Sequence, residues 1–285
     1  MKQIVGILIC LIHSSLHSES FAKFVSSMIN ESSGIVRGRI NADVYWTHND
    51  SGDAARLFAV TRDGVLIKPV WFEGDYEGIE IIGASNIDWE DIAMDESGNV
   101  VIGAFGNNGN ARRDLCLFLV PEPNPYEITM TRVGQQIRFH YPDQDSFPPD
   151  QKNFDAEALF SYDNNYFILT KNRGDEKTKL YSFPKLKLFE SNKLILDEEF
   201  DIEGLVTGAD FSPEHSLLAV LTYDSIWLFE KEKPSFLGGK HFRKKLKGTK
   251  QCEAICFDGD NLIVTNEQGS LFEFSIKEIK ANLNK

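Results

Sequence analysis

The stretch EDIAMD at 90–95, followed by NVVIGAFGNN at 99–108, decides the fold of this chain because its pattern recurs. Each copy has an acidic or small polar residue, a short apolar run, a tight turn and a second apolar run. The other four copies are SGI 33–35 with DVYWTHNDSGD 43–53, EALF 157–160 with NYFILTKNRG 165–174, ADFSP 209–213 with LLAVLTYDS 217–225, and EAICFD 253–258 with NLIVTNEQGS 261–270. A third apolar run follows each copy, as in RLFAV at 56–60 and SIWLFE at 225–230.

These runs have the composition of β-strands. They are short, rich in Val, Ile, Leu, Phe and Tyr, and separated by turns such as DESGN, YDNN and DGDN, where Gly and Asn tolerate positive φ. The copies align on one apolar anchor each, and these anchors lie 44 to 67 residues apart: Ile35, Ile92, Leu159, Phe211 and Ile255. Sheet repeats of this period predict an all-β fold, a β-propeller with five blades of four strands.

The two ends of the chain bear on how the propeller closes. The residues before the first anchor and after the last together make up one further repeat, so KFVSSMIN at 23–30 is expected to supply a strand to the last blade. Such closure hides sheet edges that would otherwise pair with other chains. The alternative is a propeller of six blades, because EITMTRVGQQIRFHYP at 127–142 adds two strand-like runs in the longest gap.

Composition and charge limit the class of protein. The chain has 285 residues, of which 42% are hydrophobic and 26% charged, as in a folded globular domain. Its net charge is -13, which argues against nucleic acid as a partner because phosphate binding needs a basic face. One basic segment, KHFRKKLKGTK at 240–250, is either a site for an anionic partner or a solvated connector.

Residues 1–22 have the layout of a secretory signal peptide. Lys2 precedes an apolar run at 4–12, and Ser20 and Ala22 are small at the cleavage positions. The apolar run is too short to cross a bilayer, which takes about 20 residues. We therefore expect a secreted monomer, periplasmic or extracellular, without a membrane span, in which residues 23–285 form a single β-propeller domain.

The acidic residues of the repeats are expected to converge on the central channel. Glu90, Glu157 and Glu253 occupy one equivalent position, with Asp91 and Asp210 one residue later. Like charges around one axis need compensation. One candidate is Ca²⁺, which takes six to eight oxygen ligands, here from Glu90, Asp91, Glu157 and Glu253. The other, which the sequence leaves open, is an ion-pair network with Arg112, Arg113, Lys171 and Arg173.

Polar residues at the ends of the second strands are expected to form a funnel at the channel mouth, where propellers bind ligands. In HNDSGD at 48–53, a histidine beside aspartates can act as a general base, although a polar turn explains the same residues. The Gly-Asn-rich stretch 106–110 is either an anion-binding loop or a mobile one. The catalytic candidates are His48, Asp50 and Lys171; the candidate ligand-binding residues are Asn49, Asp53, Asn107, Arg113, Arg173, Tyr223 and Glu267.

The motifs HNDSGDAARLFAV, NIDWEDIAMD, LVPEP, FDAEAL, LTKNRG, VTGADFSP and QCEAI occur here in an order that resembles a family of exported bacterial β-propeller proteins. The resemblance spans roughly residues 33 to 270. It implies kinship with esterase-like, phytase-like and lactonase-like propellers, many of which hold calcium on the axis. It also implies that the functional residues lie in these motifs, namely His48, Asp50, Asp53, Asp88, Glu90, Asp91, Asp155, Glu157, Lys171, Glu253 and Glu267.

The chain departs from the family pattern at two places. Ala104 and Asn107 stand where the family has acids, and residues 144–153 form a longer insert. The predicted function is a secreted β-propeller that binds a small polar or anionic ligand at the channel mouth. If it is an enzyme, we expect a calcium-dependent hydrolase of an ester or phosphoester. The alternative is a non-catalytic recognition propeller for a glycan, a peptide or an envelope protein.

Overall fold

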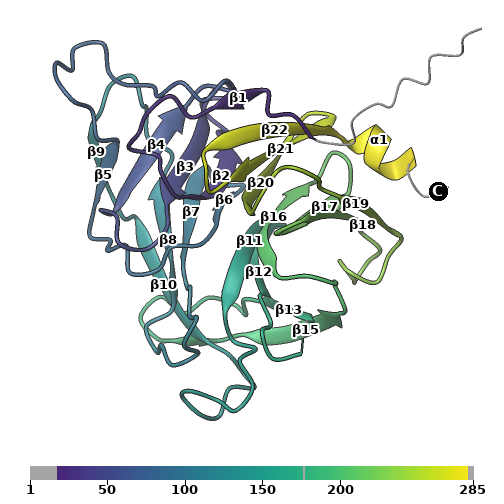
Figure 1. Ribbon diagram of the computed structural model, residues 1–285. Coiled ribbons are helices and arrows are strands. Elements are labelled where there is room, and N and C mark those ends of the chain that lie inside the picture. Colours follow the sequence, from purple (N-terminus) through teal and green to yellow (C-terminus); the bar gives the residue numbers. More distant parts are fainter. Residues whose placement is uncertain (1–17, 176, 282–285) are drawn as a thin grey trace, which may run out of the picture.

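A computed structural model describes residues 18–175 and 177–281 and folds them into a ring of five sheets (Figure 1). Each sheet is one blade. Blade 1 comprises β2 (Ser32–Arg37), β3 (Tyr45–Asn49), β4 (Arg56–Val60), β5 (Ile79–Ile82) and β9 (Met130–Arg132). Blade 2 comprises β6 (Ile92–Met94), β7 (Asn99–Ala104), β8 (Cys116–Pro121), β10 (Gln135–His140) and β14 (Asn192–Lys193).

The other three blades have four strands each. Blade 3 comprises β11 (Ala156–Tyr162), β12 (Asn165–Thr170), β13 (Thr178–Ser182) and β15 (Ile195–Phe200). Blade 4 comprises β16 (Val206–Ser212), β17 (Leu217–Thr222), β18 (Ser225–Glu230) and β19 (His241–Lys245). Blade 5 comprises β20 (Cys252–Asp258), β21 (Asn261–Asn266), β22 (Ser270–Ser275) and β1 (Ala22–Lys23), and α1 (Ile276–Ala281) follows it. This helix is short, and no helix of the described residues is long and apolar enough to cross a membrane. The innermost strands of the five blades are β2, β6, β11, β16 and β20.

The prediction of a five-bladed propeller is confirmed, and the alternative of six blades is wrong. The two extra strand-like runs at 127–142 form β9 and β10. β9 adds to blade 1, where it runs parallel to β5, and β10 is the fourth strand of blade 2. Both strands add to existing sheets, because two strands are too few to form a separate blade.

The N-terminal segment closes the ring as predicted. Ala22 and Lys23 pair antiparallel with Leu271 and Ser270 of β22, so that the last blade takes its outer strand from the start of the chain (Figure 1). The strand is shorter than expected and begins one residue earlier than 23–30. The apolar run of the predicted signal peptide, at 4–12, lies outside the described residues.

Each pair of neighbouring blades shares one hydrophobic cluster, which explains the strand composition. Trp46 and Trp89 are fully buried between blades 1 and 2, and Ile35 packs with Cys256 where blade 5 meets blade 1. Because both faces of a central blade strand are covered in this way, its side chains are buried on both faces, as all six residues of β17 are. The core therefore runs around the ring and leaves the channel ends for polar residues.

A β-bulge recurs near the start of the innermost strands. The register shifts at Ser33, Glu157, Thr207 and Glu253, and Glu90 occupies the same position before β6. A bulge inserts one unpaired residue and redirects its side chain. This common bulge carries four of the five side chains, all but the one of Thr207, into the cavity described below.

The bulge also corrects the alignment of the fourth copy. Ala209 pairs with Val220 as Ile92 pairs with Ile102, so Ala209 is the equivalent residue and the choice of Phe211 was wrong by two positions. The bulged residue of blade 4 is Thr207, which is not acidic. The sequence alignment relied on acidic residues and therefore used Asp210, which lies farther along β16.

Candidate functional site

A cavity of about 440 Å³ lies at the mouth of the channel, where the innermost strands begin and the second strands end. Its lining comes from all five blades. The lining residues are Asn30, Glu31, Ser32, Ser33, Asp50, Glu90, Asn108, Glu157, Lys171, Arg173, Tyr223, Gln251, Glu253, Glu267 and Gln268. Six of these are carboxylates and two are cationic, so that the cavity has an excess of negative charge.

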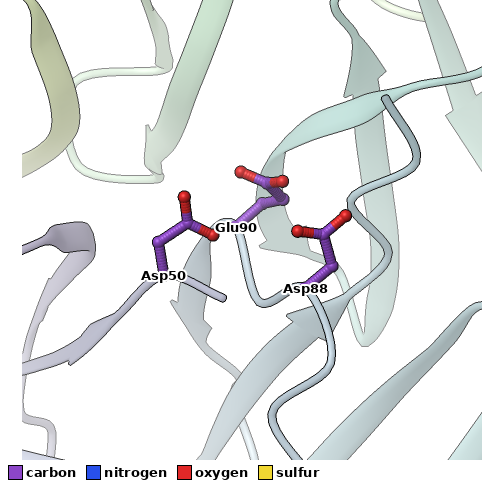
Figure 2. Close-up of side chains that lie close together, drawn as sticks. All are labelled: Asp50, Asp88 and Glu90. Carbon is purple, nitrogen blue, oxygen red and sulfur yellow. The ribbon is translucent and has the colours of Figure 1, made fainter. Parts of the chain in front are cut away.

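Three carboxylates gather at one side of this mouth. Asp50 follows β3, while Asp88 and Glu90 precede β6, and Figure 2 shows the three side chains turned toward a common space. One oxygen from each lies within 4.8 Å of the other two. Arg112 Nη1 lies 3.9 Å from Asp88 Oδ2 and compensates part of this charge. The spacing suits a further, shared cation, because carboxylates so close repel one another.

Glu90 is the most informative of the three. Its side chain is only 6% exposed, yet no N–H or O–H group of residues 18–175 or 177–281 donates to its carboxylate. Burial, with the charges of Glu157, Asp50 and Asp88, raises the pKa of Glu90 well above its usual value. A nearly buried carboxylate without a donor in the protein is unfavourable unless water or a cation in the cavity supplies the missing partner.

The backbone at Gly106 closes tightly over this cluster. A Cβ at that position would overlap Glu90 Oε1 and come within 2.6 Å of Asp88 Cγ. The Gly106 amide donates to the Asp88 carbonyl oxygen (3.1 Å), and its own carbonyl accepts from Arg112 Nη1 (2.6 Å). Glycine is therefore required here for the close approach of the chain to two carboxylates.

Lys171 enters the mouth directly after β12 and is clamped by two groups. Its Nζ donates to Glu157 Oε2 at 2.9 Å and lies 4.8 Å from the centre of the Tyr223 ring. Both charged side chains are nearly buried. Burial alone would lower the pKa of Lys171, but Glu157 and Tyr223 together outweigh it and raise the pKa, so that the ammonium stays charged.

A second acidic pair lies on blade 5. Gln251 Nε2 donates to both Glu253 Oε1 (2.7 Å) and Glu267 Oε1 (2.5 Å). Burial raises the pKa of Glu253 to about 7, with the charge of Glu267 adding to the effect. A carboxylate with such a pKa is able to exchange a proton near neutral pH.

Asp91 has a structural role and does not belong to the group formed by Asp50, Asp88 and Glu90. Its Oδ2 accepts the backbone amides of Leu159 (2.8 Å) and Ala209 (3.0 Å), and its Oδ1 accepts that of Ile92 (2.8 Å). Asp210 likewise accepts an amide from Phe257 of the next blade. These bonds satisfy the inner edges of neighbouring blades, so the prediction of Asp91 as a metal ligand is wrong, because its fully buried carboxylate is directed to three backbone amides and away from the cavity.

His48 is also misplaced by the sequence-based prediction. It lies inside β3 with 0% exposure, edge-on to the Trp89 ring, and does not line the cavity. Its Nδ1 lies 3.0 Å from the Asn49 carbonyl oxygen, and its Nε2 has no hydrogen-bonding partner among the described residues. Burial lowers its pKa. A ring that solvent does not reach cannot take a proton from a ligand in the mouth, so His48 is not a catalytic base there.

The candidate ligand-binding residues divide into two groups. Arg173, Tyr223 and Glu267 line the cavity as predicted. The other four are engaged elsewhere: Asn49 with Met28 and Asp53, Asp53 with Arg56, Asn107 with Phe154 and Arg112, and Arg113 over the Phe147 ring. None of these four lines the mouth, and their hydrogen bonds or ring contact fix loops around it.

Asn107 explains one departure from the family pattern. Its Nδ2 donates to the Phe154 carbonyl oxygen and its Oδ1 accepts the Arg112 amide. An aspartate would supply no donor for Phe154. The amide therefore belongs to the structure of the loop, which argues against 106–108 as an open phosphate-binding loop.

Sequence reasoning did not single out Asp88, Gly106 and Gln251 as parts of the site. Asp88 was indicated only by the resemblance, through the DWED motif, since it precedes the repeated unit. Gly106 stood in the quoted stretch, but only the three-dimensional structure shows what its missing Cβ makes room for. Gln251 precedes the repeat by two residues, as Asp88 precedes Glu90, and this shared offset is the signal that was missed.

Comparison with known proteins supports the fold. No family model and no curated protein matches the chain. Among solved structures, glutaminyl cyclase from Myxococcus xanthus superposes with a TM-score of 0.50 at 9% identity, over 90% of this chain and 94% of that one. Virginiamycin B lyase from Staphylococcus aureus (TM-score 0.43, 13% identity) and a candidate 6-phosphogluconolactonase from Bacteroides uniformis (0.42, 12%) each cover 86% of this chain. The chain spans 66% and 67% of these two proteins. The neighbours are β-propellers, and at 9% identity the glutaminyl cyclase structure informs on the fold alone.

Proposed function

We propose that this propeller binds a divalent cation, Ca²⁺, at Asp50, Asp88 and Glu90, and hydrolyses an ester or phosphoester in the channel mouth. The observation that carries the proposal is the buried Glu90 carboxylate, which has no donor and lies beside two further carboxylates. Calcium suits the site because all three ligands are hard oxygens. Zinc and copper are disfavoured because no histidine or cysteine belongs to the cluster.

The remaining groups of the mouth suit hydrolysis. A bound calcium ion would act as a Lewis acid on the substrate. Glu253 is the proposed base: it takes a proton from the water whose oxygen bonds to the carbonyl carbon or the phosphorus. Lys171, held by Glu157, donates a hydrogen bond to the oxygen on which charge develops. The ester bond to the alcohol breaks, and the alcohol oxygen takes up the proton that Glu253 accepted from the water. Asp50, predicted as catalytic, is assigned to the cation.

Two measurements test this proposal. Isothermal titration calorimetry with CaCl₂ should give saturable binding to the wild type and much weaker binding to Glu90→Gln. The control is Glu73→Gln, which removes the charge of an exposed carboxylate on a blade 1 loop. Turnover of p-nitrophenyl esters or phosphoesters should stop with a chelator and return with calcium. If calcium does not bind to the wild type, the site is not a metal site and the proposal fails.

The second candidate is a non-catalytic recognition propeller for a glycan, a peptide or an envelope protein. The burial of His48 favours it, because hydrolysis then lacks the base that the sequence suggested. A saturable signal on a glycan or peptide array, together with no turnover of any ester in the presence of calcium, would support this candidate over the hydrolase.

Export as a monomer is part of the proposal. The signal peptide layout of residues 1–22 supports it. A cut after Ala22 would fall within β1, which suggests that the remaining pairing at Lys23 and the Phe24 amide bond to Gly269 suffice to close the ring. N-terminal sequencing and light scattering of the exported protein test the cleavage site and the oligomeric state.

A further inference from the structure

A second cavity, of about 570 Å³, lies between blades 3 and 4 at the other end of the strands. The mouth is lined by the first residues of the innermost strands, whereas this cavity is lined by Tyr162 at the end of β11 and by residues of the hairpin turn that follows. The remaining walls come from β12, β15 and the segment after β18, including Phe167, Glu198 and Phe236. This site is separate from the proposed metal site and does not depend on it.

Three aromatic rings line this cavity and form what we call the aromatic cage, those of Tyr162, Phe167 and Phe236. Phe236 lies 4.8 Å from Phe167 and 5.6 Å from Tyr162, centre to centre, in tilted and edge-to-face contacts. The segment that carries Phe236 is tied to blade 3 by Glu198, whose carboxylate accepts the amides of Phe236 (2.7 Å) and Leu237 (3.1 Å). The rings are therefore fixed in place before any ligand arrives.

The ammonium of Lys231 lies over two rings of this aromatic cage. Its Nζ lies 3.7 Å from the centre of the Phe236 ring and 5.0 Å from that of Tyr162. Within residues 18–175 and 177–281 it forms no ion pair, although the charge of Glu198 acts on it from a distance. The ring faces are thus its principal partners, and the carboxylates of Asp163, Asp197 and Glu198 line the surrounding cavity.

We propose that this cage is a binding site for a quaternary ammonium headgroup, such as that of choline, and that Lys231 is its internal competitor. The lysine ammonium is a stand-in for the ligand, because it shows that a positive charge sits over both ring faces. A quaternary ammonium is better suited to the cage than a lysine, since it has no N–H group to lose from water when it moves onto aromatic rings. The nearby carboxylates add long-range attraction for the same charge.

Binding requires the Lys231 side chain to leave the cage and become solvated. The flexible lysine stem allows this without a change in the backbone, whose amide stays bonded to the Ser216 carbonyl oxygen. Removal of the competing ammonium should therefore strengthen ligand binding. Lys231→Ser opens the cage, and Lys231→Arg keeps a cation in it.

Calorimetric titration with choline chloride, at constant ionic strength, tests the proposal on the full chain. The wild type should show saturable binding, and Lys231→Ser should bind at least tenfold more tightly, whereas Lys231→Arg should resemble the wild type. The neutral isostere 3,3-dimethylbutan-1-ol should bind at least tenfold more weakly than choline, because it has the same shape without the charge. Tyr162→Leu in the Lys231→Ser background should lose most of the affinity.

The opposite outcomes overturn the proposal. Absence of saturable choline binding to the wild type at up to about 100 mM excludes a ligand site in the native protein. Equal binding of choline and its neutral isostere would show that the cage recognises an apolar shape and not a positive charge. Circular dichroism of each variant confirms folding, so that a lost signal reports on the cage. Sedimentation with phosphatidylcholine vesicles, compared with free choline, decides whether the headgroup is recognised on a lipid surface or in solution.

Discussion

Replacing Glu90 by glutamine should have opposite effects on stability, relative to the wild type, in the metal-free and in the calcium-bound protein. In the absence of a cation, the Glu90 charge is buried without a donor and lies beside Asp50 and Asp88. Glutamine keeps the shape of the side chain but removes this charge. The variant should therefore be more stable than the wild type in a chelator and less stable than the wild type in calcium.

The magnitudes follow from the geometry. Two unit charges 4.8 Å apart repel by about 1 kcal/mol in water and by about 3 kcal/mol at a protein surface. Glu90 takes part in two such pairs, and at the mouth, which is open to solvent, the lower figure applies, so the metal-free variant should gain about 2 kcal/mol. A cation at about 100 times its dissociation constant stabilises the wild type by about 2.7 kcal/mol. For a domain of this size each kcal/mol moves Tm by about 2–4 °C, so both effects are measurable.

Thermal melts in chelator and in excess calcium provide the assay, with Glu73→Gln as the control for loss of an exposed carboxylate. The control should follow the wild type in both buffers. If Glu90→Gln melts below the wild type in chelator, Glu90 has a stabilising partner and the reasoning about an unpaired charge is wrong. An equal calcium shift in the variant and the wild type would show that Glu90 is not a ligand.

Three further predictions concern the neighbouring groups. Gly106→Ala should abolish calcium binding measured by calorimetry while Gly109→Ala, whose added Cβ meets nothing within 4 Å, should not; equal effects would exclude steric contact with the carboxylates as the cause. Lys171→Met should lower the free energy of unfolding by about 3–5 kcal/mol in urea, because it leaves Glu157 buried and unpaired, and Lys171→Met/Glu157→Leu should recover most of the loss; no recovery would contradict the ion pair. Burial raises the pKa of Asp210 from 3.8 to about 7, so the folded state holds this proton more tightly than the unfolded state. This contribution is complete below pH 3.8 and is lost as the pH rises through about 7. The urea midpoint of the metal-free protein should thus be higher at pH 5.5 than at pH 8, with a smaller difference in Asp210→Asn, and a midpoint that rises with pH would refute this assignment.

The fold could be predicted from the sequence because each blade repeats the same local pattern. Apolar strands, Gly and Asn turns and a regular period are properties of short segments, and the structure confirms them for all five blades. The error at Phe211 has a definite cause. The fourth copy has Thr207 at the bulge, so its acidic residue no longer marked the position and the alignment moved to Asp210.

The site was predicted less completely because it depends on where strands end. In β3 the strand continues through Asn49, so His48 and Asn49 are buried between blades and only Asp50 reaches the mouth. One residue of error in a strand boundary thus exchanges a residue of the channel mouth for a core residue. Glu157 and Glu253, predicted as metal ligands, line the cavity through the recurring bulge but do not belong to the group formed by Asp50, Asp88 and Glu90.

Adjacent acidic residues in this propeller have opposite roles, and the backbone decides between them. Asp91 receives amides from the innermost strands of blades 3 and 4, and Asp210 receives one from blade 5. These carboxylates satisfy donors that a closed ring leaves on its inner strands, which is a demand of the fold itself. Glu90 precedes Asp91 by one residue but is directed to the mouth by the bulge, where no donor of the described chain reaches it. The carboxylate of Glu90 therefore accepts no hydrogen bond from the described backbone, and its negative charge remains available to a ligand. This one residue identifies the site, whereas the number of acidic residues does not.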